Sequence, residues 1–149
     1  MNRFIHIRSN KFPILPGEQE ELANEGMYGK ALAEYLQHKL ADRDYQTPFV
    51  CCEDWGWWVE IKSGPNQPVP FKFGVCIYSA NLAENESKDH QPTDFACTEG
   101  TSGLRNWSWK KMRFIDTAPW THQLHEDLLE IFVADKDIEI VGTSEEFPL

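Results

Sequence analysis

The chain has 149 residues, of which 41% are hydrophobic and 26% are charged, a composition typical of a globular protein and not of a disordered one. Its length is close to the usual size of one domain, so we expect a single domain over residues 1–149. The 24 acidic and 14 basic residues give a net charge of −10, which disfavours nucleic acid and anionic membrane surfaces and favours basic partners, although acidity also serves solubility alone.

The first third of the chain predicts one strand and one helix. Apolar and polar residues alternate over residues 3–9, as in a strand with one buried face. Pro13 and the Pro16-Gly17 pair then break regular structure. Apolar residues recur at helical spacing over residues 26–41, which predicts an amphipathic helix that Asn24 can cap.

Three strands are predicted next, over residues 49–52, 57–62 and 71–78. The stretch Glu53-Asp54-Trp55-Gly56 resembles a tight connection, and a bulged strand that continues through Gly56 is the alternative. Alternation places Trp57, Val59 and Ile61 on the core face and Trp58 on the opposite, exposed face, which it shares with Tyr78.

The second half of the chain begins with a long polar loop, predicted over residues 80–106, in which only Phe95-Ala96-Cys97 could form a short strand. A strand is predicted over 107–115, followed by a helix that Asp116 or Thr117 caps and a short strand over 138–141. The element order β-α-β-β-β-β-α-β predicts an α+β fold, a two-layer sandwich with a mainly antiparallel sheet and both helices on one face.

Histidine and cysteine chemistry has little support in the pattern. His122 and His125 have the i, i+3 spacing that can bind one metal on a helix, but a third ligand is missing from the pattern and ordinary helix histidines explain them better. Cys51, Cys52 and Cys76 fall on predicted strands, and Cys97 falls in the predicted loop, where it could be exposed. We therefore expect structural thiols, no metal and no cofactor, and we assign no catalytic residue.

The acidic and aromatic residues around the tight connection form the candidate binding patch. Carboxylates beside tryptophans can act as general acids or line a ligand platform, whereas the alternative is that Asp54 bonds within its own turn and the indoles fill the core. Because adjacent carboxylates rarely face one substrate, binding is favoured over catalysis. The candidate residues are Glu53, Asp54, Trp55, Trp58 and Tyr78.

The segment Arg105–Arg113 interleaves cations with Trp107 and Trp109, as single-stranded nucleic acid sites do. The net charge of −10 argues against that function, and the solvent face of an edge strand explains four cations equally well. We expect no nucleic acid partner.

The cellular compartment is predicted from what the sequence lacks. No apolar stretch approaches the roughly 20 residues that cross a bilayer, and the first eight residues alternate instead of forming the apolar region of a signal peptide. Four cysteines without such a signal are best interpreted as reduced thiols. We expect a cytoplasmic protein without a membrane partner.

The strings Leu15-Pro16-Gly17-Glu18, Asn24–Leu32 and above all Glu53-Asp54-Trp55-Gly56-Trp57 carry a family resemblance. The chain resembles a group of small bacterial proteins to which no activity is attached, from about residue 12 to the second predicted helix. This resemblance implies a bacterial, cytoplasmic origin and transfers no functional residue.

Together these features predict a non-catalytic binding or protein-interaction domain with a basic protein partner. An immunity-type inhibitor of a basic toxin is one concrete version. The alternatives are a small Cys- or His-dependent enzyme or metalloprotein, and a structural subunit of a homo-oligomer. The oligomeric state does not follow from the sequence.

Overall fold

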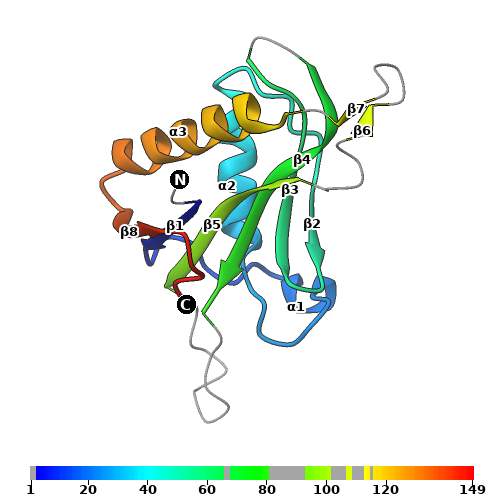
Figure 1. Cartoon of the computed structure of the whole chain (residues 1–149). Coiled ribbons are helices and arrows are strands. Elements are labelled where there is room, and N and C mark those ends of the chain that lie inside the picture. The colour runs from blue at the N-terminus through cyan, green and yellow to red at the C-terminus, as the bar shows by residue number, and fades with distance from the viewer. Residues whose placement is uncertain (1–2, 66–67, 81–92, 102–106, 109–112, 115) are drawn as a thin grey trace.

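A computed structural model describes residues 3–65, 68–80, 93–101, 107–108, 113–114 and 116–149. In these ranges the chain forms a six-stranded antiparallel sheet with three helices, so the predicted α+β sandwich is confirmed (Figure 1). The helices are α1 (Glu18–Glu21), α2 (Lys30–Ala41) and α3 (Ala118–Ala134). The strands are β1 (Phe4–Arg8), β2 (Val50–Glu53), β3 (Gly56–Ser63), β4 (Pro68–Ser79), β5 (Asp94–Thr101), β6 (Trp107–Ser108), β7 (Arg113–Phe114) and β8 (Glu139–Ser144).

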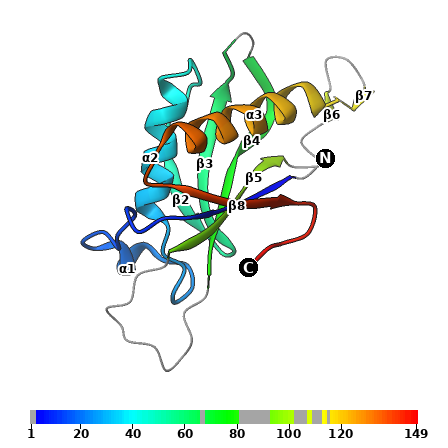
Figure 2. The same cartoon turned by 90° about the vertical axis from the view of Figure 1, so that its left-hand side faces the viewer.

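The sheet has the strand order β2-β3-β4-β5-β1-β8. Strands β2 to β5 pair consecutively as an antiparallel meander, and β1 lies between β5 and β8. Helix α2 lies along β2 and β3, whereas α3 contacts β5 and β8 (Figure 2). Both helices contribute to one core cluster with the same face of the sheet, through side chains such as Leu36 and Leu128. Of the described helices, none is long and apolar enough to cross a membrane.

Strand β5 corrects the expectation of a loop over residues 80–106. Residues 94–101 form an eight-residue strand in the middle of the sheet, while 81–92 and 102–106 lie outside the described residues. The sequence did not predict this strand because β5 contains polar residues instead of an alternating apolar pattern. Contacts with Arg3 explain how these polar residues are buried. The Arg3 guanidinium donates to Thr98 Oγ1 at 3.2 Å and to the Glu99 carbonyl at 3.2 Å, and it lies 3.6 Å from the Glu99 carboxylate.

The predicted strand over 107–115 is also wrong as a single element. Its described parts are β6 and β7, two residues each, which pair antiparallel with one another and form a separate two-stranded sheet. The predicted element order holds for the six-stranded sheet and the two long helices, with β5 in the place expected for residues 107–115, whereas α1, β6 and β7 are additional elements. Helix α3 follows as expected, with Thr117 as its N-cap residue and Asp116 accepting from the Ala118 amide at 3.0 Å.

Helix α2 begins at Lys30, four residues later than predicted, and Asn24 does not cap it. The delay has two local causes. Gly26 has a left-handed φ of 82°, and the Met27 carbonyl accepts a hydrogen bond from the Trp57 indole at 2.8 Å in place of a helical amide. Asn24 instead donates to the Asp54 carbonyl at 2.7 Å, which ties this segment to the turn between β2 and β3.

Glu18 supplies the cap that Asn24 does not. It is the buried residue of α1, and one carboxylate oxygen accepts from the amides of Gly29 (2.9 Å) and Lys30 (3.1 Å). The other oxygen accepts from the Leu15 amide at 2.9 Å. A carboxylate at this position satisfies two of the amides that a helix leaves unpaired and complements the helix dipole.

We expect Glu18→Gln to lower the free energy of unfolding by about 1.5–3 kcal/mol, because an amide nitrogen would replace one accepting oxygen against backbone N–H donors. Glu20→Gln, an exposed change on the same short helix, is the matched control, and we expect less than about 0.5 kcal/mol. Urea unfolding of both variants measures the difference. Equal midpoints would contradict the capping role of Glu18.

Candidate functional site

The site is built around a two-residue turn between β2 and β3. Glu53 pairs with Gly56, so Asp54 and Trp55 form the turn, as the tight connection predicted, and a strand continuing through Gly56 is excluded. A Cβ atom at Gly56 would lie only 2.2 Å from the Ile77 carbonyl oxygen of β4. The close approach of β3 to β4 therefore requires glycine here and fixes where the turn residues project.

Five rings gather on the sheet face opposite the helices. The Trp55 ring centroid lies 6.3 Å from that of Trp58 and 5.4 Å from that of Tyr78. Tyr78 in turn contacts Phe147 at 5.1 Å and Phe4 at 6.4 Å, with edge-on geometry. We call these five residues, Phe4, Trp55, Trp58, Tyr78 and Phe147, the aromatic cluster. It joins β1, β3, β4, the turn and the segment after β8.

Trp58 lies on the predicted face, but it is not exposed. It retains only 5% of its accessible surface, and its indole N–H donates to Glu60 at 2.9 Å. The ring lies on the backbone of β4 and β5: added Cβ atoms at Gly74 and Gly100 would stand 2.6 and 2.7 Å from it. Strand β3 is thus buried on two faces, which alternation alone does not reveal, because the two glycines that make room for the ring are on other strands.

Trp55 and Phe147 remain accessible, at 39% and 50% of their surface. Tyr78 is half-buried between them, and burial raises the pKa of its phenol, so its hydroxyl remains a hydrogen-bond donor near neutral pH. Of the aromatic residues predicted for the patch, Trp55 and Tyr78 are therefore the ones that can meet another molecule, and Phe147 joins them.

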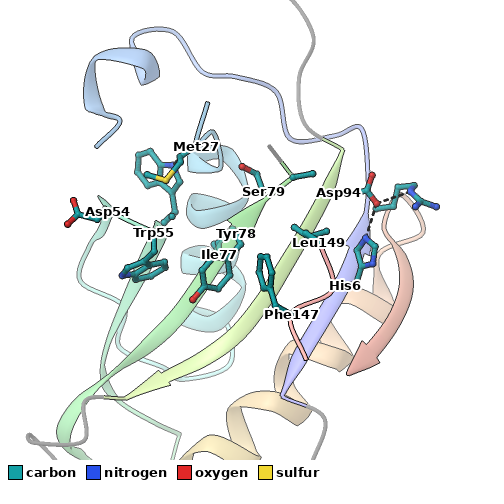
Figure 3. Close-up of a pocket in the computed structure, with 14 residues that line it drawn as sticks. His6, Met27, Asp54, Trp55, Ile77, Tyr78, Ser79, Asp94, Phe147 and Leu149 are labelled. Carbon is teal, nitrogen blue, oxygen red and sulfur yellow. Dashed lines mark hydrogen bonds and ion pairs between the residues drawn. The ribbon is translucent and has the colours of Figure 1, made fainter. Parts of the chain in front are cut away.

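An open pocket of about 570 Å³ lies against these rings (Figure 3). Asp54 and Trp55 stand at one end, His6 and Asp94 stand at the other, and Tyr78 and Phe147 lie between them. Pockets of this size that combine apolar walls with a few polar groups are the usual form of a binding site. The full lining is His6, Arg8, Met27, Asp54, Trp55, Gly56, Trp57, Ile77, Tyr78, Ser79, Ala80, Asp94, Phe147 and Leu149.

A second open pocket, of about 430 Å³, also lies beside Trp55. Its lining includes Glu53, Trp58 and Lys72, and it shares Trp55 and Tyr78 with the first pocket. All five predicted patch residues therefore line one or both pockets. Glu53 lines the smaller of these two pockets and Asp54 lines the larger one.

His6, Arg8 and Asp94 lie at the other end of the larger pocket. The sequence did not predict that these three residues belong to the site. His6 Nε2 and Arg8 Nε lie 2.8 and 3.0 Å from the same Asp94 oxygen. Burial alone would raise the pKa of the Asp94 carboxyl, but the hydrogen bond of His6 and the charge of Arg8 hold it below its ordinary value. Asp94 is thus a carboxylate at neutral pH, and the cluster joins β1 to β5 by a cross-strand ion pair.

The four cysteines are free thiols. Burial raises the pKa of Cys51 to about 11 and that of Cys76 to about 12, and it also raises the pKa of Cys52 and Cys97. A nucleophilic cysteine needs the opposite shift, so these environments favour structural thiols. Cys97, which could have been exposed in the predicted loop, is fully buried in β5.

The two helix histidines lie in different environments. His122 is exposed, whereas His125 is buried on the core side of α3. Within the described ranges, no group of three or more His, Cys, Asp or Glu side chains is arranged to hold a metal ion. In the basic segment Arg105–Arg113, residues 105–106 and 109–112 lie outside the described residues, so the prediction about nucleic acid stays a prediction.

Comparison with protein-family models, with curated proteins and with solved structures gave no match. The resemblance to small bacterial proteins therefore stays a prediction, and the site rests on its own geometry.

We expect the three neighbouring tryptophans to differ in their effect on stability. Trp57 is 2% exposed and donates to the Met27 carbonyl, so Trp57→Ala should cost about 3–5 kcal/mol. Trp58→Ala should cost at least about 2 kcal/mol, because it leaves a cavity over two glycines. Trp55→Ala should cost less than about 1 kcal/mol, since this ring is on the surface.

Chemical unfolding of the three variants measures this order. A Trp58→Ala protein that is as stable as Trp55→Ala would show that the second face of β3 is not packed.

Proposed function

We propose that the chain is a non-catalytic protein-interaction domain that binds a basic partner through the surface around Trp55. The observation that carries the proposal is the placement of Trp55, which is exposed on a turn, backed by Tyr78 and Trp58, and flanked by the carboxylates of Glu53 and Asp54. Exposed tryptophan and tyrosine side chains that are already held by neighbours lose little entropy on binding, which is why they are enriched at interaction hot spots.

The charge of the domain supports a basic partner. The net charge of −10 creates a field that accelerates encounter with a basic protein and repels an acidic one. The two turn carboxylates put part of that charge next to the aromatic anchor. An immunity-type inhibitor of a basic toxin is one concrete form of such a protein, because it needs a fast, charge-steered encounter and no chemistry of its own.

Capture from native cell extract with the immobilised protein tests the proposal. We expect a basic protein that is retained at low salt, released at high salt, and retained at least about 10-fold less by Trp55→Ala. Val133→Ala, which removes an apolar side chain that is 73% exposed on α3, is the matched control and should capture the partner normally.

Two outcomes would contradict the proposal. One is that Trp55→Ala and Val133→Ala retain the partner to the same extent, which would place the interaction elsewhere. The other is a Trp55-dependent partner that is acidic or whose retention is indifferent to salt, which would remove the electrostatic part.

A further inference from the structure

The protein's own cations already stack on two rings of the aromatic cluster. Lys72 Nζ lies 5.4 Å from the Trp58 ring centroid, and the Arg3 guanidinium carbon lies 5.5 Å from the Phe4 centroid. A cation within about 6 Å of an aromatic face is attracted by the negative potential of that face. Two of the rings next to Trp55 and Tyr78, those of Trp58 and Phe4, thus show what kind of group this sheet face accepts.

The centre of the cluster offers the same chemistry to a group from outside. Among the described residues, cations stack on the Trp58 and Phe4 rings of the cluster. None of the described cations stacks on Trp55, Tyr78 or Phe147. These three rings line the larger pocket, which is open to solvent beside them (Figure 3).

The charges that line this pocket also favour a cation. Its lining includes two carboxylates, those of Asp54 and Asp94, and one guanidinium, that of Arg8. Arg8 is itself engaged, because it bonds Asp94 at 3.0 Å and lies 3.6 Å from Glu139. The positive charge at the far end is therefore compensated. At the Trp55 end, no cation of the described residues forms an ion pair with the Asp54 carboxylate, while the Asp54 backbone carbonyl accepts from the Asn24 side chain.

We propose that this pocket binds one arginine side chain of the partner, with its guanidinium on the Trp55 face beside Asp54 and its aliphatic stem along Tyr78 and Phe147. Arginine fits better than lysine, because the planar guanidinium stacks on an indole and pairs with a carboxylate at the same time. This inference rests on the proposed function only for the source of the arginine. The arginine is then the side chain by which the domain recognises its basic partner.

Binding of N-acetyl-arginine amide to the isolated protein tests the pocket without any partner. A single stacked cation beside an exposed carboxylate is a weak site, so we expect millimolar affinity, measured from the movement of the Trp55 indole signal in an NMR titration. The neutral isostere N-acetyl-citrulline amide should bind at least about 5-fold more weakly, since it keeps the shape and loses the charge.

Two substitutions locate the site, with Val133→Ala as the unaffected control. Trp55→Ala should abolish the binding of the arginine probe, and Asp54→Asn, which keeps the ring and the turn, should weaken it about 2- to 5-fold. Asp54→Asn also keeps the test decisive if Trp55→Ala does not fold. Phe147 resonances should move with the probe, because that ring forms the opposite wall.

Equal binding of the arginine and citrulline probes would overturn the proposal, as would arginine binding that Asp54→Asn leaves unchanged. Equal binding of N-acetyl-lysine amide would overturn the choice of arginine. Failure of the pocket is distinguishable from failure of the proposed function. A captured basic partner that tolerates replacement of each of its surface arginines overturns the pocket alone, whereas an arginine-selective pocket without a Trp55-dependent partner overturns the proposed function alone.

Discussion

Two adjacent indoles on opposite faces of one strand constrain this fold more than any other feature. Trp57 points to the helices and Trp58 to the other side of β3, and both are almost completely buried. Each needs a neighbour without a side chain. A Cβ at Gly29 would lie 2.9 Å from the Trp57 ring, and one at Gly74 would lie 2.6 Å from the Trp58 ring. Because large rings must be placed on both faces, the start of α2 and the path of β4 are fixed relative to β3.

The binding surface follows from the same arrangement. Trp58 fills the second face of the sheet and supports Trp55 edge-on, while the Trp57 indole binds the Met27 carbonyl beside the larger pocket. Trp55 is left exposed because it belongs to a two-residue turn, beyond the last paired residues of β2 and β3. An exposed aromatic side chain that follows two acidic residues is thus a consequence of how the hairpin closes, and it gives the acidic domain a defined point of contact.

The sequence predicted those parts of the fold that depend on local pattern. The period of two in β1, β3 and β4, the helical stripe of α3 and the capping residues before Pro119 all identify their elements, because each element buries at least one regular face. Strand β5 was missed because it lies in the middle of the sheet with Thr98, Glu99 and Gly100 buried, and only the tertiary contacts with Arg3 and Trp58 make such residues suitable for a central strand. The cap at the start of α2 is likewise absent from the local pattern, because it is supplied by Glu18, eleven residues before the Gly29 amide that it binds.

The site could be predicted to the extent that it lies in one segment. Glu53, Asp54 and Trp55 are adjacent in the chain, and Tyr78 faces them across a hairpin whose register the alternation sets. His6, Asp94 and Phe147 come from β1, β5 and the segment after β8, and they reach the same pocket only because β1 lies between β5 and β8. That strand order is a long-range property, and a single sequence offers no local signal for it.

The requirement for glycine beneath Trp58 is tested most directly by Gly74→Ala compared with Gly142→Ala. A Cβ at Gly74 would meet the Val59 carbonyl oxygen at 2.2 Å as well as the Trp58 ring, whereas nothing lies within 4 Å of a Cβ at Gly142 on β8. We expect Gly74→Ala to lower the free energy of unfolding by about 1–3 kcal/mol or more and Gly142→Ala to change it by less than about 0.5 kcal/mol, as measured by urea unfolding. Equal stability of the two variants would contradict the packing of Trp58 on the sheet, and with it the basis on which Trp55 is positioned.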